Sequence, residues 1–438
     1  MESGAKETGA PTKGKRIGFK EAFRFWVKLG FINFGGPAGQ IAIMHRELVE
    51  RKRWVSENQF LRALNFCMLL PGPEAQQLAT YIGWRLHGMR GGLAAGSFFI
   101  IPSVFVLLLL SYLAVAYSDV PAVTGLLYGV QPVVVAVVLE AVLRIGRRTL
   151  RHAVLVAFAV ASFVAVYFLS VPFPLVVLGA ALAGFLLHLR YPNVFRIHNH
   201  GGMIEEEKSE ETAYNYRPSV FRNLRLLGVF LFLWAAPVGV LWLWRGGEDV
   251  LVDQALFFTG AAFVTFGGAY SVLSYIADVA VNQYGWLSAE QMVQGLALAE
   301  STPGPLIMVT QYVGFLGAWK FAGPFDPLLY GVLGALTTTY VTFLPCFLFI
   351  FLLAPYIELL GNNRRLQAAL AGVTAAVVGV IANLAVFFGG HVLFPGGRFD
   401  AFALIVAAVS FILLQRFTIP IYLMVPAGAL VGMAWALL

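Results

Sequence analysis

Long apolar stretches separated by short polar segments run along almost all of the 438-residue chain. A stretch of about 20 apolar residues is long enough to cross a hydrocarbon core of roughly 30 Å. The pattern therefore predicts an all-α polytopic membrane protein. Uninterrupted spans are predicted at 92–117, 121–143, 153–170, 172–189, 224–244, 327–355, 366–388, 400–415 and 419–437.

Four further apolar segments are interrupted by glycine and proline. They cover residues 17–44, 61–84, 252–275 and 289–316. The interruptions read Phe34-Gly35-Gly36, Pro71-Gly72-Pro73, Phe266-Gly267-Gly268 and Pro303-Gly304-Pro305. A broken helix in lipid exposes backbone polar groups, which are tolerated only where protein or a water-lined cavity receives them. Such breaks are the first place to look for a transporter's substrate site.

The interruptions recur at a constant spacing, which indicates an internal duplication. Gly35 and Gly267, Trp54 and Trp286, Gln59 and Gln291, and Pro71 and Pro303 all share one numerical offset. Tyr81 and Tyr312 follow the same register after a deletion of a single position in the second copy. We therefore expect a cytoplasmic tail at 1–16, a first repeat at 17–189, a polar cytoplasmic linker at 190–222, and a second repeat at 223–438 that begins with one added span.

Charge predicts how the two repeats are oriented. Residues 38–70 carry five lysines and arginines, whereas the matching residues 269–302 carry none. Because short basic loops stay on the cytoplasmic side, the matching loops face opposite sides of the membrane, and the repeat is inverted. The same rule favours interrupted segments that re-enter and return to their own side over segments that cross fully. Arg245 and Lys320 are exceptions to it.

The composition excludes several other functions. The net charge of +7 lies in short loops between spans, as in membrane proteins, and does not indicate nucleic-acid binding. The G-x-x-x-x-G-K stretch from Gly9 to Lys15 lacks the following Ser or Thr, so it is not a nucleotide-binding loop. We expect no cofactor, no metal site and no enzymatic activity.

The helix starts at the breaks predict an anion site. Unpaired N–H groups at a helix start favour negative charge, and glycine lets a ligand approach the backbone. Four breaks could surround one oxyanion near the bilayer midplane, although glycines in membrane helices also serve plain helix packing. The candidate ligands are Gly35, Gly36, Gly39, Gln40, Asn65, Gly72, Gln76, Gln77, Gly267, Gly268, Ser271, Thr302, Gly304 and Gln311.

Charged residues close to the breaks are candidates for attraction and coupling, because charge is costly within a membrane. Lys28 could attract an anion or extend to the interface. Arg46 follows the first break and could pair with Glu47. Glu74, at the helix start after Pro73, repels a dianion when ionised, which makes it a proton-coupling candidate; the alternative is a first-turn glutamate stabilised by the helix dipole. Glu300 could play the same part from the second repeat.

The first-repeat motifs resemble those of the chromate ion transporter family in its long, two-domain form. The resemblance rests on Phe34-Gly35-Gly36-Pro37-Ala38-Gly39-Gln40, His45-Arg46-Glu47-Leu48-Val49 and Leu70-Pro71-Gly72-Pro73-Glu74-Ala75-Gln76-Gln77-Leu78. It implies a secondary active transporter that exports chromate across the bacterial inner membrane and confers resistance, driven by the membrane potential or the proton gradient. Sulfate, a near-isostere of chromate, should compete.

The residues themselves indicate only an oxyanion transporter with inverted repeats. Uptake or exchange of sulfate or another oxyanion, and an anion channel, stay open as alternatives. A homodimer is an option that the sequence also leaves open.

Overall fold

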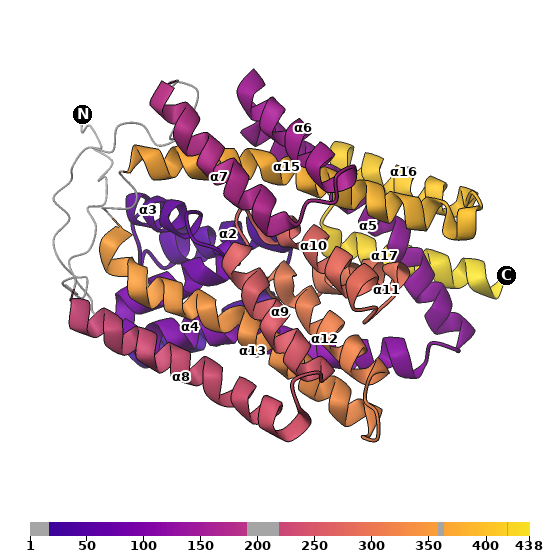
Figure 1. Ribbon diagram of the computed structural model, residues 1–438, viewed down its shortest axis with the longest axis horizontal. Helices are drawn as coiled ribbons and strands as arrows, with labels where there is room; N and C mark the ends of the chain where they lie inside the picture. The colour runs from indigo at the N-terminus through magenta and orange to yellow at the C-terminus, as the bar shows by residue number, and fades with distance from the viewer. Residues whose placement is uncertain (1–16, 191–218, 358–362, 418) are drawn as a thin grey trace, which may run out of the picture.

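The computed structural model describes residues 17–190, 219–357, 363–417 and 419–438, and Figure 1 shows them as a bundle of helices. The predicted tail at 1–16 and most of the predicted linker lie outside these residues. Six helices are long and apolar enough to cross a membrane by length and composition, and four shorter apolar helices accompany them. The prediction of an all-α polytopic membrane protein is confirmed.

The helices of the first repeat are α1 (Phe19–Ile32), α2 (Gly36–His45), the π-helical turn η1 (Arg46–Arg51), α3 (Glu57–Cys67), α4 (Glu74–Ala116), α5 (Pro121–Thr149), α6 (Ala153–Tyr167) and α7 (Phe173–Arg190). The added span is α8 (Val220–Arg245). The second repeat contains α9 (Val250–Val264), α10 (Ala269–Ala277), η2 (Asp278–Gln283), α11 (Ala289–Ser301), η3 (Leu306–Met308), α12 (Val309–Lys320), α13 (Pro327–Leu353), η4 (Ala354–Tyr356), α15 (Arg364–Leu393), η5 (Pro395–Gly397), α16 (Ala401–Phe417) and α17 (Ile421–Leu437).

The duplication extends to local backbone detail. The π-helical turns η1 and η2 stand at equivalent positions of the two repeats, directly after α2 and α10. Ser56 and Ser288 cap α3 and α11 with the same capping box, in which the serine accepts from the backbone N–H of Gln59 or Gln291. Further along, the long helices α4 and α13 each contain an internal proline. The two repeats therefore share one architecture well beyond the breaks.

The interrupted segments of the first repeat return to the side from which they enter. The Lys52 ammonium, which follows η1, lies 5.5 Å from the centre of the Phe25 ring in α1. In α4 the helix is interrupted by non-helical backbone at His87 and Gly88, and the His87 ring contacts the Ile17 carbonyl oxygen at 2.9 Å. The part of α4 before this kink thus forms a returning arm, and the remainder of α4 crosses the membrane.

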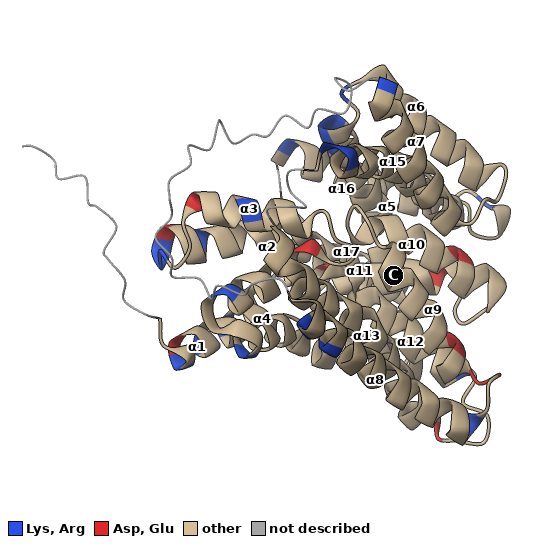
Figure 2. Cartoon of the chain, turned by 60° about the vertical axis from the view of Figure 1, so that its left-hand side comes forward, with Lys and Arg blue, Asp and Glu red and all other residues tan. Residues whose placement is uncertain are grey.

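The second repeat enters from the opposite side. The far end of α4 carries Tyr112, whose ring centre lies 6.2 Å from that of Trp319 near the end of α12. Figure 2 shows lysines and arginines gathered toward α1 and α3, whereas acidic residues predominate at the side of α9 and α12. The inverted repeat predicted from the loop charges is confirmed.

The two repeats interlock through their last helices. Helix α5 packs against α16 and α17, and α15 packs against α6 and α7. Close approach depends on small residues: a Cβ on Gly184 would lie 2.7 Å from the Ala368 carbonyl oxygen, and one on Gly372 would lie 2.6 Å from that of Ala180. Small residues allow helix backbones to pack closely where lipid supplies no hydrophobic driving force.

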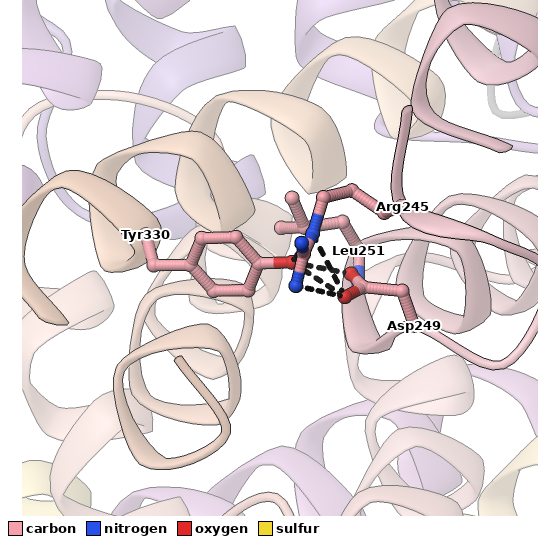
Figure 3. Close-up of polar contacts among 4 residues, drawn as sticks. All are labelled: Arg245, Asp249, Leu251 and Tyr330. Atoms are coloured by element: carbon pink, nitrogen blue, oxygen red, sulfur yellow. Dashed lines mark hydrogen bonds and ion pairs between the residues drawn. The ribbon is translucent and has the colours of Figure 1, made fainter. Parts of the chain in front are cut away.

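The two basic residues that break the charge rule have local partners. Figure 3 shows Arg245, at the end of α8, with Asp249 and Tyr330. Its Nε lies 2.8 Å from the Tyr330 hydroxyl, which donates to Asp249 at 2.6 Å, and the guanidinium contacts Asp249 at 3.1 Å. Lys320 donates to the Gly285 carbonyl oxygen at 2.7 Å. The Arg245 cluster ties the added span α8 to α9 and α13.

Candidate functional site

The four breaks meet in two pairs, and each pair joins the two repeats. The Gly72 N–H donates to the Thr265 carbonyl oxygen at 2.7 Å. The Gly304 N–H donates to the Asn33 carbonyl oxygen at 2.9 Å. Thr265 is the repeat counterpart of Asn33, and Gly304 is that of Gly72, so these two hydrogen bonds are equivalent. Each Pro-Gly-Pro break therefore crosses the Phe-Gly-Gly break of the other repeat.

Only glycine fits these two crossings. Gly72 has φ 123° and Gly304 has φ 118°, a left-handed region that side chains disfavour. A Cβ on Gly304 would lie 2.6 Å from the Ser103 Cβ, and one on Gly72 would lie 2.9 Å from the Cys346 Sγ. Both residues were predicted as anion ligands, but here their N–H groups are already paired within the protein. Their part in substrate binding stays a prediction.

The starts of α2 and α10 are more open. Gly35 and Gly268 precede these helices without a side-chain cap on the free N–H groups. Gly36 and Gly267 are half-buried, in contrast to the buried Pro-Gly-Pro segments. Uncapped first-turn amides carry partial positive charge, so these two helix starts are suited to an anion.

A carboxylate of the opposite repeat lies beside each of these helix starts. A Cβ on Gly36 would lie 3.8 Å from Oε2 of Glu300, at the end of α11. A Cβ on Gly268 would lie 3.9 Å from Oε1 of Glu74, at the start of α4. Glu300 is 3% exposed, and its Oε1 accepts a short hydrogen bond from the Tyr270 hydroxyl. Both sequence-predicted carboxylates thus lie at the breaks.

Several buried polar atoms around the crossings have no protein partner among the described residues. They belong to Asn33 (both side-chain atoms), Gln76 Oε1, Gln77 Oε1, Ser103 Oγ, Glu300 Oε2, Thr310 Oγ1 and Thr342 Oγ1. An unpaired buried polar atom costs about 1–3 kcal/mol, so such atoms are normally satisfied by water or a ligand. Gln76 and Gln77 were predicted from the sequence as ligands, and each keeps a free acceptor.

Other predicted ligands already use their side chains within the protein. Gln40 donates to the Gly304 carbonyl oxygen at 2.5 Å, which reinforces one crossing. Gln311 donates to the Val104 carbonyl oxygen and accepts from Thr339. Ser271 donates to the Phe266 and Gly268 carbonyl oxygens, and Thr302 to that of Ala299. Gly39, in the first turns of α2, is half-buried.

Three predicted residues lie at exposed positions. Asn65 on α3, Lys28 on α1 and Arg46 on η1 are all exposed. The expected pair of Arg46 with Glu47 was wrong, because Glu47 bonds Arg51 at 2.6 Å, one helical turn further along. That contact holds the pKa of Glu47 below its usual value.

Sequence reasoning missed several residues at the crossings. Asn33 and Thr265 are polar at equal repeat positions directly before the Phe-Gly-Gly breaks, a signal that could have been used. Ser103 and Cys346 both follow an in-helix proline and flank Gly304 and Gly72. Tyr270 left no such signal, because its repeat counterpart is Ala38.

Helix α5 adds charge near the breaks. Arg144 pairs with Glu140 at 3.5 Å, as their spacing indicates. Both residues act electrostatically on Glu300, and Arg148, one turn further along, acts on Glu74. No group of three or more His, Cys, Asp or Glu residues is placed to hold a metal ion within the described part of the chain.

Comparisons with known proteins agree with this architecture. The family described as "Chromate transporter" matches residues 20–185 and 252–433, one region in each repeat. The chain is 31% identical to "Chromate transport protein" of Pseudomonas aeruginosa, over 86% of this chain and 83% of that one. It is 28% identical to "Probable chromate transport protein" of Synechococcus elongatus, over 84% of each. It is 26% identical to "Chromate transport protein" of Cupriavidus metallidurans, over 94% and 92%.

No solved structure matches the chain. The family match covers more than half of the sequence and falls on both repeats. The chain therefore belongs to the chromate transporter family.

Proposed function

We propose that the protein is a secondary active, proton-coupled transporter that exports chromate across a bacterial inner membrane and so confers chromate resistance. Family membership supports chromate as the substrate. Sulfate, which is also a tetrahedral dianion, competes for the same site. The basic side around α1 and α3 faces the cytoplasm by the positive-inside rule, which also places the N-terminus there.

The observation that carries this proposal is the pair of uncapped helix starts at α2 and α10. They belong to oppositely oriented repeats, and each break of one repeat is hydrogen-bonded to a break of the other. Helix starts of this kind direct partial positive charge at an anion, in the manner of transporters with discontinuous helices. The unpartnered Nδ2 of Asn33 supplies a further donor for the oxyanion.

The inverted arrangement also supplies a route for alternating access. The returning arms of the first repeat open toward one side, and those of the second repeat toward the other. Movement of one set of arms against the other exposes the breaks to one side at a time. Glu74, beside the start of α10, couples the movement to protons: ionised it repels the dianion, and protonated it admits it.

Flux measurements in proteoliposomes test the proposal. Purified protein is reconstituted, a pH gradient or a potential is imposed separately, and radiolabelled chromate is followed with and without excess sulfate. Saturable flux that is driven by the pH gradient and inhibited by sulfate is expected. Absence of chromate flux would overturn the proposal.

The same preparation separates a carrier from a channel. A carrier gives slow, saturable flux without unitary currents, and a channel gives discrete current steps in a planar bilayer. The alternative of sulfate uptake is decided by comparing sulfate flux in the two directions with chromate absent.

A further inference from the structure

The start of α2 already has an anion beside it, and that anion belongs to the protein. Glu300 Oε2 has no protein partner among the described residues, is buried, and lies 3.8 Å from the position that a Cβ on Gly36, in the opposite repeat, would take. The other carboxylate oxygen is fixed by the Tyr270 hydroxyl. An ionised carboxylate held in this way interacts favourably with the partial positive charge at the start of α2, as an acidic side chain does at an ordinary helix start.

We propose that ionised Glu300, positioned by Tyr270, is an internal counter-ion that blocks the start of α2, and that a substrate oxyanion binds there after Glu300 takes up a proton. This inference rests on the proposed oxyanion transport and assigns a regulatory part to one carboxylate. The proton that neutralises Glu300 comes from solvent. The negative charge of the bound oxyanion then takes the place of the carboxylate charge at the start of α2.

The geometry gives Tyr270 a definite role as a positioning residue. It lies in the first turn of α10, the short helix after the other Phe-Gly-Gly break, and reaches the end of α11. Its hydroxyl donates to Glu300, which stabilises the charged form of the carboxylate. We call the hydrogen-bonded pair of Glu300 and Tyr270 the latch. Tyr270 follows the Phe-Gly-Gly break of the second repeat, and Glu300 precedes its Pro-Gly-Pro break, so the latch connects both of these breaks to the start of α2 in the first repeat.

The charges that surround this carboxylate come from α5. Arg144 and Glu140, which carry charges of opposite sign, both act electrostatically on Glu300. Because the two are paired with each other, their combined influence on Glu300 is small relative to that of a lone arginine. The remaining carboxylate at the breaks, Glu74, faces the other helix start.

Equilibrium binding of radiolabelled sulfate to the purified full-length protein tests the latch. Sulfate stays a dianion between about pH 5 and about pH 8, so any pH dependence belongs to the protein. We expect wild-type affinity to fall about tenfold as the pH rises over this range, because ionised Glu300 competes for the helix start. Glu300→Gln should keep the high affinity throughout. Glu290→Gln, on the same helix, is the matched control and should behave as wild type.

Tyr270→Phe gives a second and independent readout. Without the hydroxyl the charged carboxylate is less stabilised, so the fall in sulfate affinity should move to higher pH. A Tyr270 that only fills space would leave the midpoint unchanged. This variant also keeps the proposal testable if Glu300→Gln fails to fold.

Hydrogen–deuterium exchange in anion-free buffer tests, without any substrate, whether Glu300 acts on the start of α2. Glu300→Gln should speed exchange of the free backbone N–H groups of Gly36 and Ala38 at the start of α2, because the nearby negative charge of wild-type Glu300 slows base-catalysed exchange there. Equal pH profiles and equal exchange in the variant and wild type would overturn the proposal. If wild type binds neither sulfate nor chromate, the proposed function fails, and the exchange experiment still decides on the latch.

Discussion

The starts of α2 and α10 occupy equivalent positions in the two repeats, yet the protein surrounds them differently. Both follow a Phe-Gly-Gly break, and both face a carboxylate from the opposite repeat. At α2 the carboxylate is Glu300, which lies at the end of α11 and is held by Tyr270. At α10 it is Glu74, which begins α4 and is more open to its surroundings.

The two carboxylates are not repeat equivalents. The counterpart of Glu74 is Leu306, and that of Glu300 is Met68. The duplicated backbone therefore forms the same helix start twice, at α2 and at α10. The carboxylate beside each start comes from positions that are not equivalent in the two repeats. A symmetric scaffold with two different acids can assign different tasks to its two helix starts, for example proton coupling at one and blocking at the other.

The largest expected effect comes from the glycines at the crossings. Gly304→Ala should lower the free energy of unfolding by about 3 kcal/mol, because it combines a positive φ with overlap against the Ser103 Cβ. Gly72→Ala should cost less, about 2 kcal/mol, because its Cβ would meet the movable Gln77 amide and the Cys346 Sγ. Thermal unfolding of the purified variants checks the ranking.

A suitable control for both is Gly389→Ala in α15, where an added Cβ would meet nothing within 4 Å. It should unfold at the wild-type temperature or slightly above it, because alanine favours a helix over glycine. If Gly304→Ala and Gly72→Ala were equally harmless, the crossings would not depend on close approach, and the pairing of the two repeats would lose its main support.

The next effect concerns coupling and tests whether the two acids differ in function. Glu74→Gln should reduce proton-driven chromate flux by about tenfold or more and flatten its pH dependence, since a permanently neutral side chain cannot carry the proton. The fold should persist, because amide and carboxyl groups are nearly isosteric. Flux is measured in proteoliposomes with imposed pH gradients, with Glu290→Gln alongside. A normal pH dependence in Glu74→Gln would remove it from the coupling mechanism.

The architecture was predictable because its signals are repeated. Spans of sufficient length, the constant spacing between matching motifs and the uneven loop charges all gave the inverted repeat. Pro73 also predicted a helix beginning at Glu74, which the structure confirms. Each signal is local in sequence or recurs at a fixed offset, so no knowledge of packing was needed.

The pairing of the breaks was not predictable in the same way. Which break of one repeat meets which break of the other depends on packing between segments far apart in the sequence, such as Gly72 with Thr265. For the same reason, Gly72 and Gly304 were placed among free amides, and Tyr270 was overlooked. Local sequence showed which groups were suited to bind an anion, and the tertiary contacts showed which of them are already in use.

The smallest effect distinguishes the two π-helical turns. In η1 the carboxylate of Glu47 is 7% exposed and bonds Arg51, whereas its counterpart in η2 is the apolar Val279. Arg51 is 65% exposed, so solvent screens the pair, and Glu47→Gln should cost about 0.5–1 kcal/mol at neutral pH.

Because pairing lowers the pKa of Glu47 in the folded state, this stability is present above the unfolded pKa of about 4.3 and is lost as the pH falls through the lower, folded value. The difference in unfolding temperature between wild type and Glu47→Gln should therefore shrink on acidification below about pH 4. A difference that stays constant with pH would mean that Glu47 stabilises η1 by packing and not by its charge.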